Sequence, residues 1–307
     1  MKGIRCEQVG KLALLDMELP RRRTGEALIR VRRVGICGTD FHAFRGEQPY
    51  FTYPRILGHE LAGIIEELDE DASGFRVGDQ VSIIPYLACG KCIACRGGKP
   101  NCCAELQVLG VHADGGMRER ICVPVGNLIG TDGLSLDQTA VVEPLAIGAH
   151  AVRKAELKPG ETALVIGAGP IGLGVMAAAR QSGARVIAMD VQEDRLAFCR
   201  DWLDGAETLD ARHQPVAQLA ERTGGDYAAV VFDATGNARS MASAFQFVAH
   251  GGKLVYVGLV SADISFRDPD FHRKEMTLLG SRNATAEDFR FVIDLLRRGA
   301  IDTGRYI

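Results

Sequence analysis

The sequence has 307 residues, with 36 Lys and Arg residues against 39 Asp and Glu residues and a formal net charge of −3. Hydrophobic residues make up 47% of the chain, which excludes a disordered protein, and the near-neutral charge argues against a basic nucleic-acid-binding surface. At this length two domains are expected rather than one.

The N-terminal residues 1–7 contain no continuous apolar segment, so we expect no signal peptide. The most apolar stretch, Ala163–Ala179, is interrupted by glycines and a proline and is too short to span a membrane. We therefore expect a cytoplasmic protein with no membrane partner and no nucleic-acid partner, whose nine cysteines do not form disulfides.

Residues 1–145 are predicted to form a small, loop-rich β domain. Short β-rich runs, such as Glu26–Val34 and Gln80–Ile84, alternate there with glycine- and proline-containing turns. After this region, strands alternate with helices, which is typical of a parallel sheet wrapped in helices. The strands are expected at Thr162–Ile166, Arg185–Asp190, Ala229–Asp233, Lys253–Gly258 and Thr277–Gly280.

Two helices of this second part carry clear signals. One is expected at Gly172–Ser182, directly after the first strand. The other is opened by a capping box that runs from Thr285 to Asp288. Its apolar residues fall on one face at helical spacing, and they are Phe289, Val292, Ile293 and Leu296.

Four cysteines predict a structural zinc site. Cys89, Cys92, Cys95 and Cys103 follow one another at intervals of three, three and eight residues, which suits one tetrahedral Zn²⁺ ion held by a folded-back loop. Buried free cysteines or a redox pair are the alternatives, but the repeated triplet spacing disfavours both. A closed set of four thiolates has no open position for a substrate, so the site is structural.

A second, scattered set of residues suits a catalytic metal. The segments are Gly35–His42, Gly58–Glu60 and Val142–Pro144, and they contain a cysteine, a histidine and carboxylates. A mixed set of this kind can hold zinc and leave room for a substrate oxygen. Each segment alone is weak evidence, because a single cysteine or histidine is more often structural.

The segment Gly167–Gly172 has the pattern GxGxxG between a strand and a helix, which is the context that dinucleotide binding requires. Its glycines permit a tight turn and a close approach of a pyrophosphate to the helix N-terminus. Asp190, at the end of the next strand, can accept hydrogen bonds from ribose hydroxyls and would repel a 2′-phosphate. NAD is therefore expected rather than NADP, and a plain glycine-rich turn is the alternative.

Taken together, GICGTDFH, GHE, CGKCIAC with NCC, EPLAIGAHA, GAGPIG and DATG give the chain a family resemblance. It resembles the medium-chain zinc-containing alcohol and polyol dehydrogenases over essentially its whole length. The resemblance implies an α/β protein with a GroES-like catalytic domain at 1–145, including a zinc lobe at about 86–104, and a Rossmann cofactor domain at 146–284. Family members usually continue past this chain's end, so residues 285–307 look like a truncated return segment.

The resemblance also assigns roles. Cys37, His59 and Glu143 match the catalytic zinc ligands, and Glu60 matches a carboxylate that ligates zinc or exchanges with water. Thr39 and His42 match a proton relay, and Asp40 matches the acid that supports the liganding histidine. The implied cofactor-binding residues are Gly167, Gly169, Pro170, Ile171, Gly172, Asp190, Arg195, Thr235, Val257, Gly258 and Arg282.

These features predict an NAD-dependent oxidoreductase with two zinc ions per chain. The glutamate at position 143, rather than a cysteine, is typical of sorbitol-, threonine- and sugar-acid-type members. Within the family the chain is most similar to sugar-acid dehydrogenases, and this resemblance implies a small-molecule substrate such as an L-galactonate-like hexonate, oxidised to a keto acid. A polyol or threonine-type dehydrogenase, a zinc-free reductase and a non-catalytic NAD-binding protein are the alternatives. A homo-oligomer, either a dimer or a tetramer, is expected.

Overall fold

The computed structural model describes residues 1–70 and 74–307, which divide into two compact units. The first unit comprises 1–143 and 283–303, and the second comprises 144–282 and 304–307. Among the described helices, none is long and apolar enough to cross a membrane.

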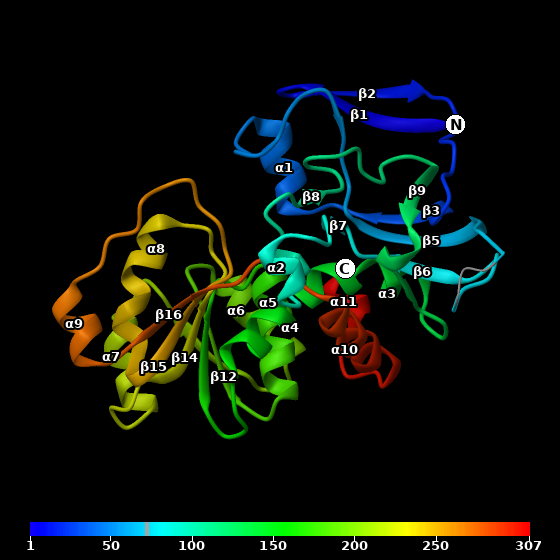
Figure 1. Cartoon of the computed structure of the whole chain (residues 1–307). Coiled ribbons are helices and arrows are strands. Elements are labelled where there is room, and N and C mark those ends of the chain that lie inside the picture. Colours follow the sequence, from blue (N-terminus) through cyan, green and yellow to red (C-terminus); the bar gives the residue numbers. More distant parts are fainter. Residues whose placement is uncertain (71–73) are drawn as a thin grey trace. The chain divides into compact units, whose positions relative to one another are not determined.

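The first unit is built around antiparallel sheets (Figure 1). One sheet has the order β2-β1-β4, a larger one has the order β10-β6-β5-β3-β9, and a small one pairs β7 with β8. The strands are β1 (Lys2–Gln8), β2 (Lys11–Asp16), β3 (Glu26–Gly35), β4 (Arg55–Ile56), β5 (Glu60–Glu67), β6 (Gln80–Ile83), β7 (Tyr86–Leu87), β8 (Gln107–Val108), β9 (Arg120–Pro124) and β10 (Leu128–Gly130).

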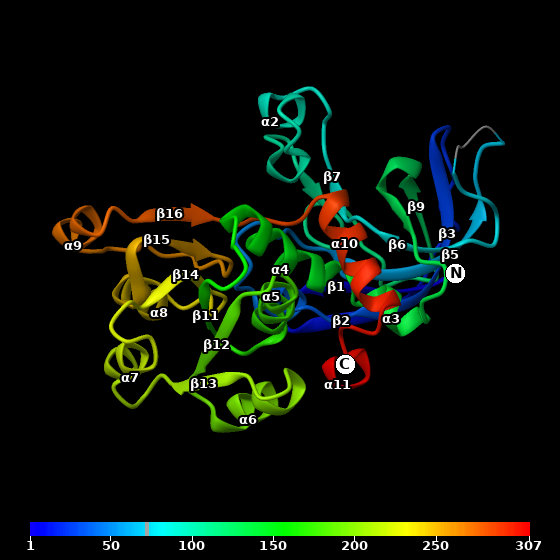
Figure 2. The same ribbon diagram turned by 90° about the horizontal axis from the view of Figure 1, so that it is seen from below.

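Short helices connect these strands. They are α1 (Gly38–Arg45), α2 (Ile93–Arg96), α3 (Leu136–Ala140) and, from the second segment of the unit, α10 (Ala286–Arg297). Short 3₁₀ turns, η1 (Pro100–Cys102) and η2 (Val125–Asn127), complete the unit. Alternating residues of β3, β5 and β6, such as Ile29, Leu61 and Val81, are fully buried and form the core of the larger sheet. The zinc lobe of about residues 86–104, which contains α2 and is called the α2 lobe from here on, projects from these sheets (Figure 2).

The second unit is a six-stranded parallel sheet flanked by helices (Figure 1). Its order is β13-β12-β11-β14-β15-β16, which is the 3-2-1-4-5-6 order of a Rossmann fold. The strands are β11 (Thr162–Ile166), β12 (Arg185–Asp190), β13 (Glu207–Asp210), β14 (Ala228–Asp233), β15 (Val248–Tyr256) and β16 (Thr277–Gly280). The apolar faces of these strands form the core of the unit, with Leu164, Ile187 and Val231 fully buried.

The helices of this part are α4 (Val142–Ala155), α5 (Pro170–Gln181), α6 (Glu193–Trp202), α7 (Pro215–Arg222), α8 (Ala238–Ser243), α9 (Asp268–Arg273) and α11 (Thr303–Tyr306), together with the 3₁₀ turn η3 (Ala244–Phe247). Helix α5 begins at Pro170, which has no backbone N–H to leave unpaired in the first turn.

The fold class predicted from the sequence is confirmed. Strands β11 and β12 have the expected bounds, and α10 starts with the expected capping box between Thr285 and Asp288. The apolar face of α10 is buried, as its spacing indicated.

Candidate functional site

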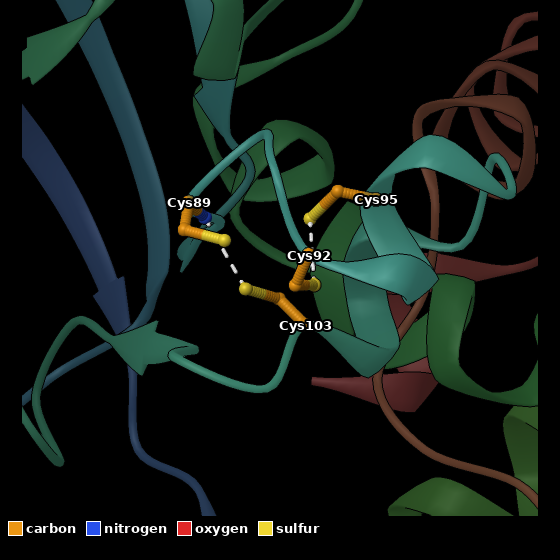
Figure 3. Close-up of side chains that lie close together, drawn as sticks. All are labelled: Cys89, Cys92, Cys95 and Cys103. Atoms are coloured by element: carbon orange, nitrogen blue, oxygen red, sulfur yellow. Dashed lines mark hydrogen bonds between the residues drawn. The ribbon is translucent and has the colours of Figure 1, made fainter.

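The four cysteines of the predicted structural zinc site lie together in the α2 lobe. Their sulfur atoms all lie within 4.8 Å of one another, and their side chains point toward one another (Figure 3). The Cys92 and Cys95 sulfurs are 3.5 Å apart, and the backbone N–H of Cys89 donates to the Cys103 sulfur over 3.2 Å. Cys102 is exposed and stands outside this cluster. The arrangement fits one tetrahedral Zn²⁺ ion.

Backbone hydrogen bonds favour the thiolate, the form that binds metal, at Cys89 and Cys92, whereas burial and the neighbouring thiols raise the pKa of Cys95 to about 12. Hydrogen bonds from the backbone of Ala104 and Cys95 lower the pKa of Cys92 to about 6. All cysteines that the structure describes are free, so the lobe has no disulfide to hold it in shape. The loop geometry therefore suits a metal as its cross-link.

A second donor cluster lies at one end of the larger antiparallel sheet. The ligand atoms of Cys37, His59 and Glu60 lie within 4.8 Å of one another. Cys37 is the N-cap residue of α1, His59 directly precedes β5, and Glu60 is the first residue of β5. Both His59 and Glu60 are buried, so an imidazole ring and a carboxylate are shielded from water in this cluster.

Asp40 fixes the backbone that carries two of these donors. Its carboxylate accepts the N–H of Cys37 over 2.9 Å and the N–H of Gly58, which precedes His59, over 3.2 Å. The side chain of Asp40 is only 3% exposed. Asp40 therefore holds both the Cys37 turn and the approach to His59, whereas His59 Nδ1 has no hydrogen-bond partner within 1–70 and 74–307.

The charges of the cluster are strongly coupled. Burial lowers the pKa of His59, but a hydrogen bond with Cys37 and the charges of Cys37, Glu143 and Asp40 raise it to about 10. Burial and the charge of Glu143 raise the pKa of Glu60 to about 7. The ring nitrogen Nδ1 of His59 has no hydrogen-bond partner among the described residues and lies near a thiol and buried carboxylates. These groups together suit the binding of a metal ion.

Gly35 makes room for the Glu60 carboxylate. The two residues face each other across β3 and β5, and a Cβ atom at position 35 would lie 1.9 Å from Glu60 Oε2 and 2.8 Å from its Cβ. No side chain can occupy that space while Glu60 keeps its position. The glycine is therefore part of the cradle of the second donor cluster.

Glu143 is buried in the first turn of α4 and is not among the three mutually close donors. Burial raises its pKa, and its charge in turn acts on His59 and Glu60. The hydroxyl of Tyr86 donates a hydrogen bond to Glu143 Oε1. Tyr86 was not predicted from the sequence, where the only signal for it is its position three residues before Cys89.

The two residues predicted for the proton relay both lie on α1, in different surroundings. Thr39 is half-buried, whereas His42 is exposed. The Nδ1 atom of His42 lies 2.9 Å from a carboxylate oxygen of Glu47, a partner that the sequence did not reveal. Cys37, the N-cap residue of α1, thus belongs to the donor cluster, whereas His42, further along the same helix, is exposed to water.

In the second unit, the glycine-rich turn has the geometry that its sequence required. Gly167 follows β11 with a φ of 97°, in the left-handed region that favours glycine. A Cβ atom on Gly172 would lie 1.8 Å from the carbonyl oxygen of Gly167. Gly169 is the N-cap residue of α5, with Pro170 exposed and Ile171 half-buried after it. The N-terminus of α5, whose N-cap residue has no side chain, suits a phosphate.

Asp190 ends β12 and braces this turn. Its carboxylate accepts the N–H of Ala168 over 2.7 Å and the N–H of Gln192 over 2.9 Å, and only 6% of the residue is exposed. The guanidinium of Arg195 lies 3.8 Å from Asp190 Oδ2. Asp190 thus holds the backbone of this turn, and its expected role at the cofactor ribose stays a prediction.

The remaining residues predicted to bind the cofactor lie at the carboxyl ends of neighbouring strands. Thr235 follows β14 and donates to Asp233, and the N–H groups of Val257 and Gly258 donate to the Asp233 carbonyl oxygen. Arg282 is exposed, just beyond the end of β16. The carboxyl edge of a doubly wound sheet is where ligands bind in such folds.

Residues 23–132 match the alcohol dehydrogenase GroES-like domain, and residues 170–298 match the zinc-binding dehydrogenase family. The chain therefore belongs to the zinc-type medium-chain alcohol dehydrogenase family. It is accordingly an oxidoreductase that acts on CH–OH groups.

Individual relatives cover almost the whole chain. L-galactonate-5-dehydrogenase of Escherichia coli K12 is 45% identical, covering 98% of this chain and 88% of that protein. The 2-dehydro-3-deoxy-L-galactonate 5-dehydrogenase of Pseudoalteromonas atlantica is 33% identical, covering 93% and 84%. The crystal structure of the alcohol dehydrogenase RspB of E. coli CFT073 with NADH has a TM-score of 0.92 at 30% identity, covering 99% and 90%. The family resemblance stated from the sequence motifs is thus confirmed.

Proposed function

We propose that this protein oxidises a secondary alcohol of a sugar acid, a hexonate similar to L-galactonate, to the keto acid with NAD as the hydride acceptor. The observation that carries the proposal is the donor set of half-buried Cys37 with buried His59 and Glu60, with buried Glu143 nearby. Such a carboxylate-rich set suits a polyhydroxylated substrate, and two relatives are named for galactonate-type acids.

Zinc is the metal that these residues fit. Cys37 and His59, with a carboxylate from Glu60 or Glu143, would hold it, and Cys89, Cys92, Cys95 and Cys103 would hold a second, structural ion. A zinc ion at the first site supplies Lewis-acid polarisation of the reacting hydroxyl.

The chain's own residues move the proton. Thr39 accepts the proton of the substrate hydroxyl at its Oγ1 atom while its own hydroxyl proton is released toward His42. Because the imidazole of His42 is exposed and contacts Glu47, it can exchange that proton with bulk water. Asp40 fixes the relative positions of Cys37 and His59 by accepting hydrogen bonds from the backbone N–H groups of Cys37 and Gly58.

The glycine-rich turn and Asp190 select the cofactor in this proposal. Gly167 and Gly172 allow the pyrophosphate to approach the N-terminus of α5. The negative charge of Asp190 disfavours a 2′-phosphate, so NAD is preferred to NADP. Arg195, Thr235, Val257 and Gly258 complete the proposed cofactor contacts. Arg282 either joins them or pairs with the carboxylate of the hexonate. A cytoplasmic location and a homo-oligomeric state stay predictions.

The proposal is tested by following NADH formation with purified protein on a panel of hexonates and the corresponding polyols. We expect the highest kcat/KM on a hexonate with NAD. Activity confined to uncharged polyols would replace the sugar-acid assignment by a polyol dehydrogenase. Better use of NADP than of NAD would overturn the role given to Asp190.

A further inference from the structure

Tyr86 is the one hydroxyl donor that the structure records on Glu143, among the residues it describes. The two residues are 57 positions apart, on β7 and α4, and both are buried. The phenol has one proton to donate, and it goes to Oε1 of the carboxylate. Oε2 of Glu143 is not engaged by this bond.

The surroundings of Tyr86 leave it little freedom. Its ring packs edge-on against Phe289 of α10, with the ring centroids 6.5 Å apart. Asn127 donates its side-chain amide to the carbonyl oxygens of Ile84 and Tyr86 over 2.8 and 3.1 Å. Strand β7 also pairs with β8 at Val108. Backbone and ring are therefore both held, and the hydroxyl has a fixed direction.

Glu60 differs in its partner: within residues 1–70 and 74–307 its carboxylate is hydrogen-bonded by the thiol of Cys37 and by no tyrosine. Its carboxylate lies over Gly35 and belongs to the close donor group with Cys37 and His59, whereas Glu143 does not. Two buried carboxylates thus approach one cluster, and only one is tied by a tyrosine. A carboxylate with one oxygen engaged by a tyrosine has only its other oxygen to offer a metal ion.

We propose that Tyr86 is a positioning residue that presents Glu143 to the catalytic metal as a one-oxygen ligand. This assignment rests on the proposed function, because it requires a metal at Cys37, His59 and Glu143. A hydrogen-bonded partner of a metal-binding side chain typically changes metal affinity 10- to 100-fold when it is removed. Tyr86 is expected to act on that scale without touching the substrate.

The test uses Tyr86→Phe, which deletes only the hydroxyl. The zinc-loaded protein is titrated with a competing chelator, and the zinc that stays bound is measured per chain. We expect one zinc to be lost with an affinity about 10- to 100-fold lower than in the wild type. The other zinc, at the four cysteines, should be retained with unchanged affinity, and it reports in the same sample that the first unit is folded.

Tyr53→Phe is the matched control. The Tyr53 hydroxyl also donates a hydrogen bond in the first unit, but to the carbonyl oxygen of Ala43. Both zinc ions should stay bound in this variant. Cobalt replacement supplies a second readout, because the visible absorption of Co²⁺ at the catalytic site should change in Tyr86→Phe and stay the same in Tyr53→Phe.

A double-mutant cycle shows whether Tyr86 acts through Glu143. Adding Tyr86→Phe to Glu143→Ala should cause no further loss of metal affinity. Full additivity would overturn the assignment, as would wild-type zinc affinity with unchanged Co²⁺ absorption in Tyr86→Phe. Equal loss of both zinc ions would also overturn it, because Tyr86 would then support the fold. A wild-type protein that binds only the structural zinc would overturn the proposed function as well, so the two failures are distinguishable.

Discussion

Replacing Asp190 by alanine should both loosen the glycine-rich turn and weaken the preference for NAD. The carboxylate accepts two backbone N–H groups, from Ala168 and Gln192. Ala168 is buried, so its N–H loses its partner without gaining water, at a cost of about 1–3 kcal/mol. Gln192 is exposed and can turn to water, so its bond adds about 1 kcal/mol. We expect a total loss of about 2–4 kcal/mol in the free energy of unfolding.

Urea unfolding without cofactor measures the stability, and fluorescence titrations with NADH and NADPH measure the two affinities. Asp190→Asn separates the two effects, because it keeps an oxygen for the Ala168 N–H but removes the charge. It should recover part of the stability and still narrow the preference for NADH. Asp226→Ala, an exposed carboxylate of the same unit, is the control and should change stability by less than about 0.5 kcal/mol.

An Asp190→Ala variant whose stability matches that of the Asp226→Ala control would refute the stabilising role given to Asp190. In that case the two hydrogen bonds would not hold the turn. An unchanged ratio of NADH to NADPH affinity in both Asp190 variants would separately remove Asp190 from cofactor selection. A loss of stability without a change in this ratio would leave only the structural duty.

Three further predictions concern the other sites. Cys92→Ser should lose one zinc and lower the melting temperature, because metal binding contributes to folding, whereas Cys37→Ser should lose the other zinc with a smaller change in melting temperature. Metal analysis and calorimetry measure the two effects. Loss of both ions from Cys37→Ser would contradict two independent sites. His42→Ala should reduce turnover moderately, most at low pH, with partial rescue by small external bases; an unchanged pH profile removes His42 from the relay. Arg282→Lys should raise KM more for a hexonate than for the matching polyol at saturating NAD, since lysine cannot form a bidentate pair with a carboxylate; equal increases assign Arg282 to the cofactor.

The sequence predicted the parallel-sheet unit well because its signals are local. The apolar run Thr162–Ile166 and the glycine-rich turn after it stand next to each other in the chain. Strand β15, in contrast, begins at Val248 rather than at the expected Lys253. Its early part pairs across a shift in register, and Gly251 has a φ of 72°, so the alternation that marks a strand is broken there.

The donor cluster was less predictable, because it depends on which distant segments meet. Family resemblance named both Glu60 and Glu143 beside Cys37 and His59 without deciding between the two carboxylates, and the donor group of mutually close atoms contains Glu60. That choice depends on the space above Gly35, which exists only once β3 and β5 are paired. The bond from Tyr86 to Glu143 links β7 to α4 and has no periodic signature in the sequence.

The division of the first unit between residues 1–143 and 283–303 has a consequence for how the protein is made. On the ribosome, the strands of this unit emerge first but lack α10, whose Phe289 is fully buried and packs against Tyr86. The second unit is almost entirely one continuous stretch of chain, so it can fold as soon as it has been translated. The nascent β unit must therefore wait, with part of its apolar interior uncovered, until residues 283–303 leave the exit tunnel. Chaperone contact during synthesis should concentrate in this interval.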